Sequence, residues 1–473
     1  MKNHITHRTG LIGLSFLYIN VPLVLFYVYW LKWYWILPTV GLFSAYSLYQ
    51  VYQLKSPSFT VGEVLKLLGI SLALVLVSGI SGVGGKSTFD VIHHLQKVYD
   101  FSQSSLPIYY DRPSAYASYY FGFYIVPGLI LGFMNNITLV MGMWEWLGMF
   151  LGLSWIYLVL KRNFLLLLLL FFMSGLLSLL FPLLQGDNLL TSPYFYFKDT
   201  RWNLLPMYLS LRWVPNQFIY TLIVTGMILY LPAKKLVHLS TLFLAGLFWT
   251  PFPTVALGCV YLLRIFPVLR ASTWRFLVQF FSVNLFLAAF LILFLLANQT
   301  STGMEFTLIS ADRWKNYFLL IGAEILVFYA LLEARYRKRK ITTLVLLLLL
   351  FLPLLKLGVG NDLYSRASLP VLMILYLYFL KSLTATSVLQ GVRILVLLCG
   401  ALLPLKYVGD NLLQFSMKPH YTPDKMYDTY DLIRRDYKSK TTADQYLMDQ
   451  KSVFYKYLLD KKKVPQNSPG DLH

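Results

Sequence analysis

Charged residues are the scarcest component of this sequence. Of its 473 residues, 13% are charged and 57% are hydrophobic, whereas a soluble domain has about 25% charged and roughly 45–50% apolar residues. The apolar residues come in runs of about 17–24, the length needed to cross a hydrocarbon core roughly 30 Å thick. One such run, residues 163–184, has no charged side chain. The composition excludes a soluble globular fold and predicts an all-α polytopic membrane protein.

Cysteines and nucleotide-binding motifs are also scarce. The two cysteines, Cys259 and Cys399, both lie in apolar runs, so they are expected to be small buried hydrophobic residues and not a structural disulfide. The sequence has no P-loop, no Rossmann glycine pattern and no DxD-type sugar-nucleotide motif. The segment 84–87 (GGKS) resembles the end of a P-loop but lacks its first glycine. A substrate carried by a lipid needs none of these motifs.

Acidic residues number 21 against 41 Lys and Arg, for a net charge of +20. On a soluble protein this excess indicates nucleic acid, but in a membrane protein basic loops anchor the cytoplasmic side, and no nucleic-acid partner is expected. Some basic residues are alternatively placed to meet lipid phosphates or an anionic substrate. The densest cluster, residues 335–340, is predicted to be cytoplasmic.

Hydropathy predicts roughly 13–14 transmembrane helices in a domain of residues 1–405, followed by a polar C-terminal tail, 406–473. The apolar segments are Gly10–Trp30, Trp33–Tyr52, Glu63–Ile80, Tyr119–Met134, Ile137–Leu160, Asn163–Leu184, Gln217–Leu231, His238–Trp249, Val255–Phe266, Thr273–Ala297, Asn316–Leu332, Ile341–Leu357, Leu369–Leu380 and Val392–Leu405.

Counting crossings places the tail and the loops 81–118, 185–216, 298–315 and 358–368 on the extracytoplasmic side. The counts from the two ends of the chain disagree between residues 119 and 184. There, one of three apolar segments must be re-entrant, or two must share a crossing, or one end is misassigned. Simple counting leaves Lys161 and Arg162 on the outer side.

The first large loop contains a predicted amphipathic helix, Ser87–Phe101, which lies in the membrane interface. Asp90, His93, His94 and Lys97 share its polar face at i, i+3, i+4 and i+7. One interpretation is an ordinary solvated face. The other makes Asp90 a general base, with His93 and His94 as acid–base or substrate contacts. Two adjacent histidines near an aspartate also leave a divalent metal open as an alternative; no other cofactor is indicated.

Further polar candidates lie in the other outer loops. Asp111 is a second candidate base, and Arg112, Arg201 and Arg212 lie among aromatic residues in a pattern that suits sugar stacking and phosphate binding.

Asp362 and Arg366 are four residues apart in the loop 358–368. They form either a helix-capping ion pair or a grip on a lipid-linked phosphate. Glu145 and Glu324 lie inside apolar segments, where a carboxylate is a functional candidate by default.

The order of these parts resembles the GT-C superfamily of integral membrane glycosyltransferases. The resembling stretch is residues 90–124, an Asp- and His-bearing amphipathic helix followed by DRPSAYASYYFGFY entering a helix. The resemblance implies a GT-C-like fold with interfacial helices in the first large loop and a polyprenyl-phosphate-linked sugar donor. It also implies a carboxylate base in that loop, with Asp90 as first choice and Asp111 as second. The chain departs from the family in having three predicted helices before this loop instead of one.

The expected activity is inverting sugar transfer at the extracytoplasmic face of the plasma membrane, in assembly of a cell-envelope glycan or glycolipid. Its partners are then the lipid-linked donor, a glycan or lipid acceptor, and membrane lipids. A lipid-linked polysaccharide polymerase or ligase and a transporter or flippase are the alternatives. An outer cleft holding Asp90, Asp111 and Arg366 favours an enzyme, whereas a central pathway through Glu145 and Glu324 favours transport.

Overall fold

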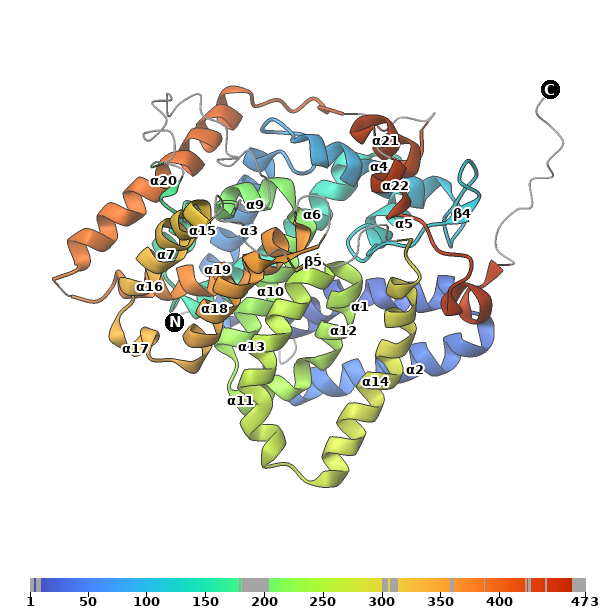
Figure 1. Cartoon of the computed structure of the whole chain (residues 1–473), viewed down its shortest axis with the longest axis horizontal. Coiled ribbons are helices and arrows are strands. Elements are labelled where there is room, and N and C mark those ends of the chain that lie inside the picture. The colour runs from blue at the N-terminus through green and yellow to red at the C-terminus, as the bar shows by residue number, and fades with distance from the viewer. Residues whose placement is uncertain are drawn as a thin grey trace.

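The computed structural model describes residues 4–5, 10–177, 180, 204–299, 305–306, 314–357, 361–386, 388–421, 423, 427–438 and 440–461. Most of these residues are helical, and few lie in strands (Figure 1). The strands among them form short antiparallel pairs: β1 (His4–Ile5) with β2 (Phe59–Thr60), β3 (Tyr109–Tyr110) with β4 (Ala115–Tyr116), and β5 (Glu305–Phe306) with β6 (Leu355–Lys356). The all-α class is confirmed.

Seven helices of the described residues are long and apolar enough to cross a membrane. Their lengths of 18 to 24 residues correspond to about 27–36 Å at roughly 1.5 Å per residue, close to the hydrocarbon thickness. The molecule is therefore a multi-pass helical membrane protein. The seven are α1 (Gly10–Trp30), α3 (Val61–Ser78), α6 (Ile137–Val159), α13 (Pro251–Arg270), α14 (Trp274–Leu296), α19 (Asp362–Ser382) and α20 (Gln390–Leu413).

Every predicted apolar segment contains helix, but several of these helices are too short to be counted as spans by length. The number of 13–14 crossings therefore stays a prediction. The remaining α-helices are α2 (Trp33–Gln53), α4 (Phe89–Gln103), α5 (Ile125–Met134), α7 (Phe164–Phe171), α9 (Met207–Trp213), α10 (Pro215–Tyr230), α11 (Ala233–Leu236), α12 (Ser240–Trp249), α15 (Trp314–Leu320), α16 (Val327–Ala330), α17 (Ala334–Arg337), α18 (Lys340–Phe351), α21 (Thr429–Tyr437) and α22 (Lys440–Asp444). Short 3₁₀ or π turns span Val237–Leu239, Ile321–Leu326, Leu352–Leu354 and Phe454–Leu458.

The core of the bundle is the parallel pair α6 and α10, which are packed more extensively than any other described helix pair. Glycines allow this approach: a Cβ on Gly152 would come within 2.6 Å of Leu222, and one on Gly226 within 2.4 Å of Trp155. The pairing of residue 152 with 222 and of 155 with 226 shows that the two helices run in the same direction. α10 therefore begins at the same face of the bundle as α6.

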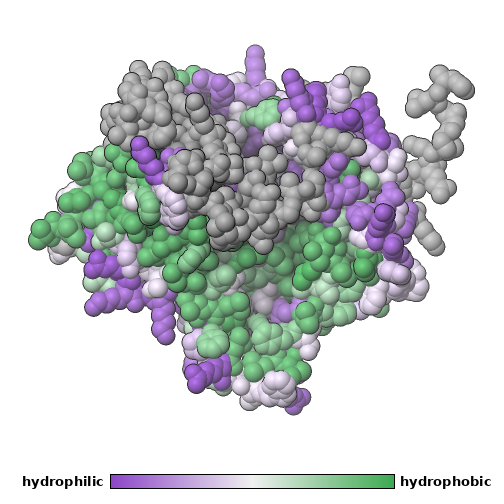
Figure 2. Space-filling model, in the orientation of Figure 1, coloured by the Kyte–Doolittle hydropathy of each residue, from purple (hydrophilic) through white to green (hydrophobic). Residues whose placement is uncertain are grey.

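Two polar faces bound an apolar band (Figure 2). We call the upper one, with α4 and α21, the site face, and the lower one, with α11 and α17, the basic face (Figure 1). On the basic face, Arg162 pairs with Glu63 at 2.8 Å, and Lys235 Nζ donates to the Gln53 carbonyl at 2.8 Å. These contacts join the chain segments that follow α2, α6 and α10.

Helix α5 accounts for the crossings that sequence counting left unresolved. Its 10 residues span about 15 Å, half of the hydrocarbon core. α6 begins at the site face, because Cβ atoms on Gly82 and Gly142 would contact Thr138 and Ser81 respectively. Both ends of α5 therefore lie at the site face, and it is the segment that does not cross. Lys161, at the far end of α6, lies on the basic face instead of the outer side.

The described residues of the tail after α20, which end at residue 461, pack on the site face. α20 continues to Leu413, beyond the predicted end at residue 405. Backbone bridges then join Ser416 to Gly84, Leu447 to Ala117 and Leu459 to Leu31. Because these partners lie in the first loop and at the turn between α1 and α2, the tail covers the loop that carries α4.

Candidate functional site

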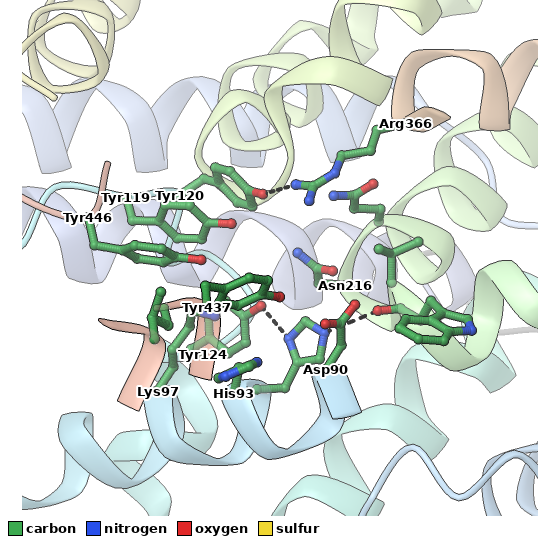
Figure 3. Close-up of a pocket in the computed structure, with 15 residues that line it drawn as sticks. Asp90, His93, Lys97, Tyr119, Tyr120, Tyr124, Asn216, Arg366, Tyr437 and Tyr446 are labelled. Carbon is green, nitrogen blue, oxygen red and sulfur yellow. Dashed lines mark hydrogen bonds between the residues drawn. The ribbon is translucent and has the colours of Figure 1, made fainter. Parts of the chain in front are cut away.

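Helix α4 follows the predicted Ser87–Phe101 segment to within two residues. Thr88 is its extended N-cap, and Asp90 lies in the first turn, where a carboxylate is favoured by the helix dipole. Its buried apolar side chains pack towards α5, while the polar side chains of the other face line a cavity of about 100 Å³. We call this space the polar cavity (Figure 3). The amphipathic pattern thus predicted both the helix and its polar face.

The walls of the polar cavity come from five parts of the chain. α4 contributes Asp90 and Lys97, the segment before α5 contributes tyrosines, and the start of α10 contributes two amides. Arg366 enters from α19, and Tyr437 and Tyr446 enter from the tail. The tail is held there by hydrogen bonds from Ser118 N to the Tyr446 carbonyl and from Met448 N to the Tyr116 carbonyl, both 2.8 Å.

Asp90 carries the carboxylate of the cavity floor. It is half-buried and makes no hydrogen bond or ion pair with another described side chain. Burial raises the pKa of Asp90, while the positive charges of Arg366 and Lys97 lower it in part. A carboxylate with a raised pKa and no bound partner is suited to accept a proton from a ligand.

Lys97 is a buried cation without a carboxylate partner among the described residues. Its side chain is 4% exposed, and its ammonium lies 5.2–5.5 Å from the ring centroids of Tyr119, Tyr124 and Tyr446. Cation–π attraction to three phenol rings offsets part of its desolvation. Burial nevertheless lowers the pKa of Lys97 to about 8, although Asp90 acts to raise it. Lys97 therefore provides positive charge below about pH 8.

Arg366 faces Asp90 across the cavity from the first turns of α19. Its Nη2 pairs with Asp362 Oδ1 at 3.0 Å, and its Nη1 donates to the Tyr120 hydroxyl. The predicted i, i+4 ion pair is present. Arg366 also lines the cavity, and its grip on a phosphate stays a prediction. Asp362 orients the guanidinium towards Tyr120 and the cavity.

The two histidines of α4 line the polar cavity and also bond to neighbouring parts of the chain. His94 Nε2 lies 3.4 Å from the Trp213 carbonyl, an acceptor, so this nitrogen carries the proton, and Nδ1 accepts from the Tyr124 hydroxyl at 2.6 Å. Burial lowers the pKa of His94 well below its usual value, and lowers that of His93 to about 4. The neutral His93 donates from Nε2 to Asp436 Oδ2 at 3.1 Å, and this hydrogen bond joins α21 to α4.

Two amides at the start of α10 were missed by sequence reasoning. Asn216 and Gln217 are 2% and 1% exposed, line the cavity, and have side-chain oxygens without a partner. In Figure 3 the Asn216 amide lies between Asp90 and Arg366. Buried amides without partners are costly, so both are available to a polar ligand. The one sequence signal was a pair of amides at the end of an otherwise apolar segment.

The other predicted site residues lie away from the polar cavity. Asp111 is exposed in the β3–β4 turn, and Arg112 beside it pairs with Asp431 at 3.2 Å. Arg212 is buried and donates to the backbone carbonyls of Ser78 and Lys86. These three residues therefore do not meet at the polar cavity, contrary to the expected convergence of the outer loops. Arg201 lies outside the described residues.

A second cavity of about 380 Å³ adjoins the polar cavity. The two share Tyr119, Tyr120, Arg366 and Tyr446. Three of these rings form a stack, with centroids 3.8 Å apart for Tyr119–Tyr120 and 4.4 Å for Tyr119–Tyr446. Beyond the stack, apolar side chains from the start of α13, the end of α14 and Leu357 line one part of the wall, and the rest is polar: Ser118, Asn298, Asp362 and Gln445. We call this space the apolar cavity.

The two carboxylates inside the bundle line neither cavity. Glu324 Oε1 accepts from the Leu177 backbone N–H at 3.0 Å, so it provides a hydrogen-bond acceptor for the backbone shortly after α7 ends. Glu145 is fully buried in α6, and neither of its oxygens has a hydrogen-bond partner. Within the described residues the two do not form a continuous polar path.

No cluster of three or more His, Cys, Asp or Glu side chains that could hold a metal ion occurs in the described part of the chain. Comparison with known proteins gives no match to a family model, a curated protein or a solved structure. The evidence for the chemistry of the site is therefore its own geometry.

Proposed function

We propose that this protein is a membrane glycosyltransferase that uses a sugar donor linked to a polyprenyl phosphate. The observation that supports this most strongly is the composition of the polar cavity. An unpaired carboxylate, Asp90, shares a small space with two cations, Lys97 and Arg366, and two unsatisfied amides. Hydroxyl-rich, anionic ligands satisfy all of these groups at once.

In the proposed reaction Asp90 accepts the proton of the acceptor hydroxyl, while the oxygen of that hydroxyl bonds to the anomeric carbon of the donor. The bond between that carbon and the phosphate oxygen breaks, and its electron pair leaves with the phosphate. Arg366 and Lys97 stabilise the negative charge that develops there. Because acceptor and leaving group lie on opposite sides of the carbon, the configuration inverts.

The apolar cavity supports a lipid-linked donor. It opens beside Arg366 and is lined on one side by Pro251, Phe252 and Leu295. A phosphate at Arg366 can thus have its sugar in the polar cavity and the first units of its chain in the apolar cavity. This division gives each chemical part of the donor a matching environment.

Of the alternatives, the polymerase or ligase uses the same site and differs in its acceptor. The transporter is supported less, because Glu145 and Glu324 line neither cavity, and substrate pathways are typically lined by such midplane groups.

The test is a comparison of Asp90→Asn with Asp111→Asn. Membranes containing each variant are supplied with a radiolabelled sugar on a short-chain isoprenyl phosphate, and transfer to glycolipid or polysaccharide is counted. Loss of the base should reduce transfer about 10²–10⁴-fold in Asp90→Asn, whereas the exposed Asp111→Asn should retain it. Full transfer by Asp90→Asn would rule out this assignment of the base.

A further inference from the structure

Cationic side chains from separate parts of the chain converge on the basic face, opposite the polar cavity. Lys381 ends α19, about 22 Å along that helix from Arg366 at roughly 1.5 Å per residue. The positive charges of Arg339, Lys161 and Arg335 all act on the Lys381 ammonium, and Arg339 also acts on Arg264 of α13. The basic cluster is Lys161, Arg264, Arg335, Arg339 and Lys381.

Two of the three guanidinium groups of the cluster lie against aromatic rings. Arg339 lies 5.2 Å from the Tyr336 centroid and 5.5 Å from that of Tyr378, while Arg335 lies 4.9 Å from Tyr336. The two tyrosine rings are stacked, with centroids 5.3 Å apart. An arginine that lies over a ring face loses little further freedom when its N–H groups bind a phosphate. The cluster is therefore organised before any ligand arrives.

Carboxylates compensate little of this charge. Within the described residues, Glu333 pairs with Arg335 at 2.8 Å, and no carboxylate pairs with Lys161, Arg339 or Lys381. Like charges held close together repel one another. An anion bound among them would relieve that repulsion and would gain charge-assisted hydrogen bonds.

We propose that the basic cluster binds the phosphate of an anionic phospholipid. Lys161 and Lys381 lie at the ends of the apolar helices α6 and α19, Arg264 lies in the second half of α13, and Arg335 and Arg339 lie just before α18, at the level where lipid headgroups meet the protein. At the start of α7, just after Lys161, Leu165 and Leu168 are 65% and 39% exposed; three residues apart, they share one helical face and offer apolar surface to acyl chains. A soluble phosphate would use the cations but not this surface, so the placement favours a lipid.

The test is native mass spectrometry of the full chain in detergent with added phosphatidylglycerol or phosphatidylcholine. We expect phosphatidylglycerol to bind more tightly. Removing one charge near a headgroup costs about fivefold in affinity, so Arg339→Gln and Lys381→Gln should each weaken binding about fivefold, and the double variant about 25-fold. Soluble glycerol phosphate should not compete, because it has no acyl chains.

The matched control is Arg337→Gln with Lys338→Gln, which removes two exposed charges from the same loop but outside the cluster. This control should bind phosphatidylglycerol as the unmodified protein does. An equal loss in the control, equal binding of phosphatidylcholine, or competition by glycerol phosphate would each overturn the proposal. If the double variant does not fold, Arg339→Gln and Lys381→Gln by themselves test the proposal.

Discussion

Lys97 is the residue whose role depends most directly on pH. Because its pKa is lowered to about 8 by burial, its charge is present below that pH and is lost above it. The polar cavity then loses one of its two cations. Affinity for an anionic ligand should therefore fall as pH rises through about 8, and a phosphate contact to a charged group is worth roughly 1.5–3 kcal/mol.

The measurement is binding of a short-chain isoprenyl phosphate by titration calorimetry between pH 6.5 and 9.5. Lys97→Met should bind the isoprenyl phosphate at least about tenfold more weakly at pH 7, because it lacks a contact of this energy. Its affinity should show no step near pH 8. Lys86→Met, an exposed lysine of the same loop outside both cavities, should behave as the unmodified protein. A step near pH 8 that persists in Lys97→Met would show that another group causes it.

Residue by residue, sequence predicted those site members that follow from local periodicity. Asp90 and Lys97 lie seven residues apart in one amphipathic helix, so their common face could be predicted without tertiary information. Arg366 could be named as a candidate, but its position opposite Asp90 depends on how α19 packs. Tyr437 and Tyr446 had no local signal, because they reach the site through backbone pairing of the tail. Asp111 had the right chemistry but lies in an exposed turn.

At the scale of elements, α21 depends on one buried carboxylate of α4. Asp100 Oδ2 accepts the Thr429 backbone N–H at 2.9 Å, at the start of α21. Burial raises the pKa of Asp100 to about 7, against the hydrogen bonds from Thr429 and Gln96 that lower it. An exposed aspartate titrates near 4, so the docked state binds more protons between about pH 4 and 7. The contribution of Asp100 to docking is therefore largest below pH 4 and is lost as pH rises to about 7.

Amide hydrogen exchange over residues 429–437, corrected for the intrinsic effect of pH, measures this docking. His93, which also joins α4 to α21, has a lowered pKa and favours docking as pH rises, so the comparison is between chains. From pH 5 to pH 8, protection in the unmodified chain should change less favourably than in Asp100→Asn, where the opposing Asp100 effect is absent. Arg112→Gln breaks a pair in which Arg112 is exposed but Asp431 is buried, so it should lower protection at both pH values and leave the difference between pH 5 and pH 8 unchanged. The same change in protection between pH 5 and pH 8 in the unmodified chain and in Asp100→Asn would contradict the prediction.

At the scale of the whole molecule, hydropathy predicted the helices well and their topology less well. An apolar segment is a local property, so each predicted segment contains helix. Whether a segment crosses depends on its length and on where its ends pack. Tyr119–Met134 was predicted as one apolar segment, yet its helical part has only 10 residues and both ends lie at the site face. That difference reverses the side assigned to Lys161 and Arg162.

The two faces define the last prediction, which is tested by labelling single cysteines in a chain whose Cys259 and Cys399 are replaced by alanine. Lys451 is exposed in the tail, whereas Lys161 and Lys338 are exposed on the basic face. Basic loops are retained in the cytoplasm, so a membrane-impermeant maleimide should label Lys451→Cys in intact cells. It should label Lys161→Cys and Lys338→Cys only after permeabilisation. Labelling of Lys161→Cys together with Lys451→Cys in intact cells would restore the sequence-based count and contradict the re-entrant position of α5.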